Sequence, residues 1–197
     1  MKYYHAKPKE FNIITELLQK VQTTVFDDLC VLIEYPDYLL FQGRTEKKYN
    51  ESNYQNLNIP ISKNLWTSGG IGIFSPGAIV IGAVSSDKNV VTSLRDSIYG
   101  LIKPFCIERK LEYDINNNDI LINHQKLSGV FINETAQKQY VMGLYINNKA
   151  PNNLIKEVTN NYQRMGVGLE ELNISSTEVI KKIEELFEDK IDEIKRP

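Results

Sequence analysis

A β-hairpin is predicted between Asn118 and Gly129, and it constrains the fold more than any other stretch of the chain. Its letters, NDILINHQKLSG, give an apolar run at 120–122, turn residues at 123–125 and a return strand at 127–132. The hairpin brings together three polar groups: the acid Asp119, an amide and the lysine Lys126. These groups could converge on one polar ligand. Lysine suits a phosphate, and Asn and Asp can order a magnesium ion with its waters. The same letters also suit a surface hairpin with a solvated lysine.

The rest of the chain alternates between helical and extended patterns. Apolar residues recur at helical spacing over 11–25, 90–102 and 154–162, and in a C-terminal helix at about 176–194 that opens with a capping box. Extended runs lie at 29–34, 38–41, 59–61, 78–85 and 140–146. The turn Pro36-Asp37 predicts that the first two strands pair, and Lys103-Pro104 is expected to end the second helix. We therefore predict an α+β fold: one domain, 1–197, with helices packed on a mostly antiparallel mixed sheet.

Composition argues against several classes of partner. The net charge is −2 with scattered Lys and Arg, so no basic block indicates nucleic acid. The N-terminus is polar without an apolar signal core, and the longest apolar stretch, 78–84, is far shorter than a membrane span. Cys30 and Cys106 lie in apolar runs without metal-ligand spacing, which predicts two buried free thiols. Together these features predict a cytoplasmic protein that binds neither nucleic acid nor membrane.

A glycine-rich stretch, 66–77, is a second candidate for ligand binding. Gly69, Gly70 and Gly72 fall within four residues, and Gly77 follows in a Pro-Gly turn. Glycine lets a backbone pass close to a ligand and can leave N–H groups facing a carboxylate or phosphate. A β-bulge and hairpin without any ligand would use the same residues.

Two motifs in order resemble the biotin and lipoate protein ligase family. The first is Asn118-Asp119, six residues, then Lys126-Leu127-Ser128-Gly129, and the second is the strand VMGLYIN at 141–147. Two upstream stretches resemble lipoate ligases in particular: Gly43-Arg44 followed by Glu51-x-Asn53, and Ser68-Gly69-Gly70 followed by Phe74 and Pro76-Gly77. The resemblance covers roughly 11–147.

The resemblance implies an enzyme that uses ATP and Mg²⁺ to activate lipoate, or a related carboxylic acid, as an acyl-adenylate. The acyl group then passes to a lysine of a lipoyl or biotinyl carrier domain. Lys126 would be catalytic, close to the reacting carboxyl group, where its charge stabilises developing negative charge. Asp119 would bind the metal. The residues implied in cofactor binding are Gly69, Gly70, Gly77, Asn118, Ser128 and Gly129. We expect these 197 residues to leave no room for the small C-terminal domain of many such ligases, which an accessory subunit would then supply.

Several departures from the family pattern keep other functions open. Leu65 and Trp66 replace an arginine pair, Ile71 replaces a glycine, and Ser75 replaces a histidine. Because the lost cations help to hold the adenylate in the family, a non-catalytic relative that binds a partner or small ligand is the main alternative. An octanoyltransferase would need a cysteine in the connector at 164–168, which has none.

Overall fold

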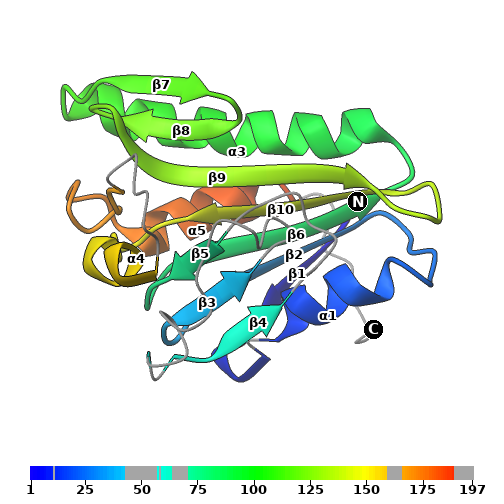
Figure 1. Ribbon diagram of the computed structural model, residues 1–197. Helices are drawn as coiled ribbons and strands as arrows, with labels where there is room; N and C mark the ends of the chain where they lie inside the picture. Colours follow the sequence, from blue (N-terminus) through cyan, green and yellow to red (C-terminus); the bar gives the residue numbers. More distant parts are fainter. Residues whose placement is uncertain (11, 43–56, 58, 64–70, 159–165, 189–197) are drawn as a thin grey trace.

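A seven-stranded sheet forms the centre of the computed structural model, which describes residues 1–10, 12–42, 57, 59–63, 71–158 and 166–188. The strands, in spatial order, are β1 (Lys2–Ala6), β2 (Leu29–Glu34), β6 (Ile79–Ser85), β10 (Tyr140–Ile146), β9 (Gln125–Glu134), β8 (Asp119–Ile122) and β7 (Tyr113–Asn116) (Figure 1). β1 pairs with β2 in parallel, and all other neighbours in this sheet are antiparallel. The predicted α+β fold with a mostly antiparallel mixed sheet is confirmed.

Helices cover both faces of the sheet because its inner strands are apolar on both sides. Every residue of β6 is buried, as expected for a central strand. α3 (Lys88–Glu108) and α5 (Ser176–Glu185) pack on one face, over a core that includes Leu32 and Ile81. α1 (Ile13–Lys20), which follows the short 3₁₀ helix η1 (Pro8–Glu10), packs on the other face over Ile33 and Val80 (Figure 1).

A small second sheet contributes to the α1 face. It contains β3 (Leu39–Gln42), β4 (Ile61–Lys63) and β5 (Ile71–Phe74) in the order β4-β3-β5, and α4 (Asn152–Val158) contacts β5. The predicted pairing of 29–34 with 38–41 is wrong, because β1 and β6 already occupy both edges of β2. The chain leaves the main sheet at Tyr35, whose N–H donates to Ala78 O at 2.9 Å and whose carbonyl accepts from Gly77 N at 2.8 Å.

Two predicted helix ends differ from the structure. α1 ends at Lys20, and Val25, assigned to its apolar stripe, is 67% exposed. α3 continues through Pro104 to Glu108 instead of ending there. Pro104 is exposed, so water can replace the hydrogen bond that proline cannot donate, while the buried Ile102 and Cys106 anchor the helix on either side.

The C-terminal helix begins as predicted. Ser175 Oγ accepts a hydrogen bond from Glu178 N at 3.3 Å, which caps α5. The α-helix ends at Glu185, and predicted positions 189–194 lie outside the described residues, as does 159–162 beyond α4.

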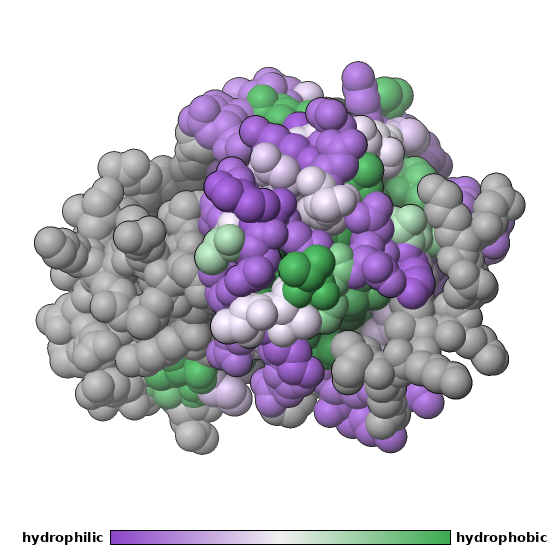
Figure 2. All heavy atoms as spheres, turned by 90° about the vertical axis from the view of Figure 1, so that its right-hand side faces the viewer, coloured by the Kyte–Doolittle hydropathy of each residue, from purple (hydrophilic) through white to green (hydrophobic). Residues whose placement is uncertain are grey.

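The molecular surface is mainly polar on the face shown in Figure 2, where hydrophobic areas among the coloured atoms are small. Large exposed apolar side chains are scattered: Val25, Ile61, Ile107, Ile115 and Leu186. Scattered apolar residues of this kind are usual on protein surfaces. No helix in the described ranges has the length and apolar character needed to cross a membrane.

Candidate functional site

The predicted hairpin is the second half of a three-stranded meander, β7-β8-β9. Its turn consists of Asn123 and His124, with φ of 49° and 65°, and Gln125 already pairs with Ile122 in the strand. A similar two-residue turn, Asn117 and Asn118 at φ 51° and 71°, joins β7 to β8 and was not predicted. Positive φ at both central residues matches the strand twist and favours Asn, which explains the asparagines at three of the four positions.

A β-bulge in β9 decides which side chains face the site. Ile120 pairs with Ser128 and Leu121 with Lys126, so Leu127 is an extra residue. Leu127 and Ser128 are both fully buried, Leu127 in the core beneath α3 and Ser128 close to Tyr99 of that helix. Lys126 and Gly129, three residues apart, therefore share the opposite face. Ser128, a predicted cofactor-binding residue, lies on the α3 side of the sheet.

Lys126 forms an ion pair with Asp119. Its Nζ lies 2.9 Å from Asp119 Oδ2, and the two side chains are 30% and 20% exposed. The ammonium also lies 5.6 Å from the centroid of the Tyr145 ring. Burial alone would lower the pKa of Lys126, but its charge interactions and hydrogen bonds with Tyr145 and Asp119 outweigh burial and raise that pKa. Lys126 is therefore charged and held in place by Asp119 and Tyr145. It is not a solvated surface lysine, which was the alternative interpretation.

This ion pair lines a cavity of about 160 Å³ between α1, β5 and the α1 face of the main sheet. The lining residues are Ile14, Thr15, Leu18, Tyr35, Gly72, Phe74, Val80, Asp119, Lys126, Gly129, Val130, Phe131, Gly143, Leu144 and Tyr145. Within the described part of that lining, Asp119 and Lys126 carry the charge and the other residues are mainly apolar or aromatic. A ligand with an apolar body and a carboxylate head matches this distribution.

Two glycines make room for side chains that line the cavity. A Cβ at Gly129 would lie 2.9 Å from both Lys126 Nζ and Tyr145 Cε1, and a Cβ at Gly143 would collide with the Phe131 ring. The predicted residue Gly129 thus allows Lys126 and Tyr145 to lie flat against β9. Gly143, from the second motif, does the same for Phe131.

The last residue of that second motif, Asn147, supports the backbone of the hairpin. Its N–H donates to Leu127 O at 2.9 Å and its side chain donates to Lys126 O at 3.3 Å. Lys126 O also accepts from Val167 N at 3.0 Å. The bulge is therefore fixed by the strand end of β10 and by the connector before α5.

The remaining predicted residues lie around this site or outside the described structure. Asn118 is exposed in the β7–β8 turn, and Gly77, at φ 78°, is in the β5–β6 turn against Asn148. Gly77 is not among the described residues that line the cavity. Ser75 is buried, where its hydroxyl donates to Lys149 O at 2.7 Å. Positions 43–53, Leu65, Trp66, Ser68, Gly69 and Gly70 lie outside the described residues.

Among the described residues that line the cavity, Asp119 is the one with the carboxylate chemistry of a metal ligand. The described residues contain no group of three His, Cys, Asp or Glu side chains that could hold a metal ion. Magnesium is commonly held by one or two carboxylates together with substrate phosphates. The residues present therefore fit Mg²⁺ only as an ion that arrives with a nucleotide and uses Asp119 as its protein ligand.

Three residues near the site were missed by the sequence analysis. Tyr145 is part of the second motif but was given no role, although its ring contacts Lys126. Arg95 and Tyr99, four residues apart on α3, both bond to Asn118. The spacing shows that they share one helix face, but the partner of that face is set by the meander turn, which the sequence did not reveal.

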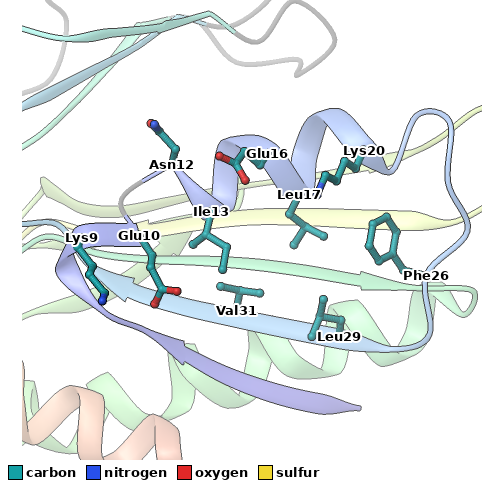
Figure 3. Close-up of a pocket in the computed structure, with 10 residues that line it drawn as sticks. All are labelled: Lys9, Glu10, Asn12, Ile13, Glu16, Leu17, Lys20, Phe26, Leu29 and Val31. Atoms are coloured by element: carbon teal, nitrogen blue, oxygen red, sulfur yellow. The ribbon is translucent and has the colours of Figure 1, made fainter. Parts of the chain in front are cut away.

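A larger cavity of about 260 Å³ lies beside α1, over β2 (Figure 3). Its floor is apolar and formed by Ile13, Leu17, Phe26, Leu29 and Val31, and its rim carries Lys9, Glu10, Asn12, Glu16 and Lys20. None of the predicted site residues is among these lining residues. The cavity at Lys126 is therefore the candidate site.

Comparison with solved structures of known proteins supports the fold of this chain. No family model matches the sequence, and no curated protein matches it. The crystal structure of P. falciparum LipL1 in complex with lipoate matches with a TM-score of 0.69 and 18% identity, over 98% of this chain and 64% of that chain. A bipartite lipoate protein ligase from Thermoplasma acidophilum, described with its E2 lipoyl domain, matches with a TM-score of 0.70 and 13% identity, over 99% and 86%.

A lipoate–protein ligase A bound with ATP is similar to the same degree, with a TM-score of 0.68 and 12% identity over 100% of this chain and 87% of that one. The chain therefore has the biotin/lipoate protein ligase-like fold, as its motifs predicted. It spans 64% of the length of the P. falciparum protein. At these identities the similarity establishes the fold.

Proposed function

We propose that this protein is a lipoate–protein ligase-like enzyme. In the first half-reaction a carboxylate oxygen of the acid attacks the α-phosphorus of ATP, and pyrophosphate leaves. In the second, the amine of a carrier-domain lysine takes the acyl group from the acyl-adenylate, and AMP leaves. Lipoate is the proposed acid, because lipoate and a lipoyl domain accompany two of the structural neighbours.

The observation that carries this proposal is the position of Lys126. Its ammonium lines an otherwise mainly apolar cavity and is held by Asp119 at 2.9 Å. An apolar acyl chain in the cavity would place its carboxylate at this cation, where negative charge on the reacting oxygen is stabilised. Because the ammonium is already fixed by Asp119 and Tyr145, little reorganisation is needed when the acid binds.

Acyl-adenylate formation tests the proposal. Lys126→Ala should abolish acyl-AMP, detected by mass spectrometry after incubation with ATP, Mg²⁺ and lipoate. The free energy of unfolding should fall by about 1 kcal/mol, because the pair removed is partly exposed. Lys138→Ala is the matched control, because Lys138 lies in the turn after β9 and pairs at the surface with Glu134, the last residue of that strand. Wild-type levels of acyl-AMP in Lys126→Ala would remove this lysine from the mechanism.

A non-catalytic relative is the second candidate, and Ser75 is the observation that favours it. Ser75 stands where the family has a histidine, and its hydroxyl is buried between the carbonyl and N–H of Lys149. Ser75 therefore supports the turn, and its neutral hydroxyl provides no positive charge for binding an adenylate. A wild-type protein that binds lipoate but yields no acyl-AMP in the presence of a lipoyl domain would favour this candidate.

An octanoyltransferase finds no support at this site. The two cysteines of the chain, Cys30 of β2 and Cys106 of α3, are fully buried in the core between the sheet and the helices α3 and α5, on the face of the sheet away from the cavity. A cysteine nucleophile must reach the acyl group as a thiolate.

A further inference from the structure

Two aromatic side chains form the floor of the cavity at Lys126, and each lies opposite a glycine on the neighbouring strand. In the register of β9 and β10, Tyr145 faces Gly129 and Phe131 faces Gly143. A Cβ at Gly129 would lie 2.9 Å from Tyr145 Cε1, and a Cβ at Gly143 would collide with the Phe131 ring. Each ring therefore lies flat over its glycine, in the space that another residue would fill with its own side chain.

Backbone makes up the rest of the floor between these two strands. Val130 and Leu144 also line the cavity, but their side chains pack in the core beneath α3, on the other face of the sheet. Ile14 and Leu18 of α1 line the cavity from the side opposite the sheet. The cavity is thus a slot with an aromatic floor and an aliphatic roof.

The two ends of the floor differ in chemistry. The Tyr145 end lies beside Lys126, whose Nζ is 5.6 Å from the centroid of the Tyr145 ring. Phe131 follows Gly129 on β9 at the next position on the same face, which is roughly 7 Å farther along at the usual rise of a strand. An acid whose carboxylate meets the Lys126 ammonium therefore extends its apolar chain toward the Phe131 ring.

An aromatic ring at this position discriminates between the ends that such an acid can have. Divalent sulfur is polarisable and makes favourable contacts with aromatic rings, which a saturated methylene group does not match. A five-membered disulfide ring, the dithiolane of lipoate, therefore gains more from Phe131 than the end of a saturated fatty acid does.

We propose that Phe131 is a specificity-determining residue of the cavity: its ring, flat over Gly143, contacts the sulfur atoms of a dithiolane-ended acid and favours that acid over a saturated one. That the acid is lipoate rests on the proposed function. The arrangement of the two rings over their glycines rests on the geometry alone.

Phe131→Leu tests the inference, because leucine keeps an apolar side chain and removes the ring. Octanoate is the matched ligand, since it has the carbon skeleton of lipoate without the disulfide. Calorimetry with each acid, without nucleotide, gives two association constants for each protein. The ratio of the lipoate constant to the octanoate constant should fall about two- to tenfold in Phe131→Leu. A general loosening of the cavity weakens both acids and leaves this ratio unchanged.

Phe105→Leu is the matched control. Phe105 is also partly buried, but it belongs to α3 and packs against the core on the other face of the sheet. The same substitution there should leave the ratio at its wild-type value. A second measurement locates the acid directly: nuclear Overhauser contacts in the wild-type complex should join the Phe131 ring protons to the dithiolane protons, and not to the methylene group beside the carboxylate.

The outcomes separate this inference from the proposed function. A wild-type ratio in Phe131→Leu, a Phe131 ring without contacts to the dithiolane, or a wild-type protein that binds neither acid overturns the inference. A lowered ratio in Phe131→Leu but not in Phe105→Leu supports it. If that wild-type protein then yields no acyl-AMP with ATP and Mg²⁺, the proposed function alone fails. Acyl-AMP formed by a protein whose ratio is independent of Phe131 means that the inference alone fails.

Discussion

The Lys126 side chain contributes to stability because its charge is favoured in the folded state. Its pKa is raised above the ordinary value of 10.5. A raised folded pKa means that the contribution is complete below the unfolded pKa and is lost as pH rises through the folded pKa. The difference in unfolding free energy between wild type and Lys126→Met should therefore be equal at pH 7 and pH 9, and smaller at pH 11. Urea titrations measure it. A difference that grows between pH 7 and pH 9 would mean that burial dominates and lowers the pKa.

The two cysteines should react slowly with alkylating agents in the native protein. Burial raises the pKa of both thiols, Cys30 and Cys106, and the thiolate is the reactive form. Iodoacetamide labelling followed by mass spectrometry should show little modification at pH 8, and full modification in urea. Rapid native labelling accompanied by loss of activity would restore the acyltransferase alternative.

Residue chemistry at the site could be predicted only where a motif carried it. The spacing from Asp119 to Lys126 indicated that the two could act together, and they form an ion pair. Arg95 carried no such signal, because an arginine on a polar helix face is usually solvated. Its partner Asn118 lies in a turn whose position depends on how the meander packs against α3.

The β8–β9 hairpin is the element that shapes the site, and its bulge gives Gly129 a specific task. Gly129→Ala should destabilise the protein by about 1–3 kcal/mol and reduce acyl-AMP formation, because the new methyl group displaces Lys126 from Asp119. Gly100→Ala is the control: nothing lies within 4 Å of its Cβ position in α3, so stability should rise by about 0.5–1 kcal/mol. Chemical denaturation measures both. A Gly129→Ala variant with wild-type stability and activity would show that the site accommodates the methyl group without displacing Lys126.

Two strands with a continuous apolar run, β2 and β10, were predicted with accurate ends, whereas helix ends and strand pairing were predicted less well. Strand β10 has the predicted bounds because its apolar run is continuous and flanked by polar residues. The prediction that β2 pairs with β3 is wrong because the turn sequence at Pro36 gives no information on which edges of β2 are free. The bulge at Leu127 was not predicted either, because a regular and a bulged strand can have the same sequence.

The molecule as a whole should bind ATP weakly when isolated. Leu65, Trp66 and Ser75 stand where the resemblance places two arginines and a histidine, and each hydrogen bond to a charged group is worth about 1.5–3 kcal/mol. Even one lost bond then weakens binding about tenfold or more. A carrier domain or accessory subunit would complete the site. Calorimetry with ATP, Mg²⁺ and lipoate checks this, and submicromolar binding without a partner would show that the chain compensates for the substitutions internally.

The cavity at Lys126 takes its walls from α1, near the start of the chain, and from β10, more than a hundred residues later. The cavity therefore does not exist until the long-range strand pairs of the main sheet have formed, and no partly folded chain offers it. A ligand that fills the cavity binds only the fully folded chain, so its binding free energy adds to the unfolding free energy of the whole domain. Hydrogen exchange should then slow in α1 and β10 together on ligand binding, although the two segments are far apart in sequence.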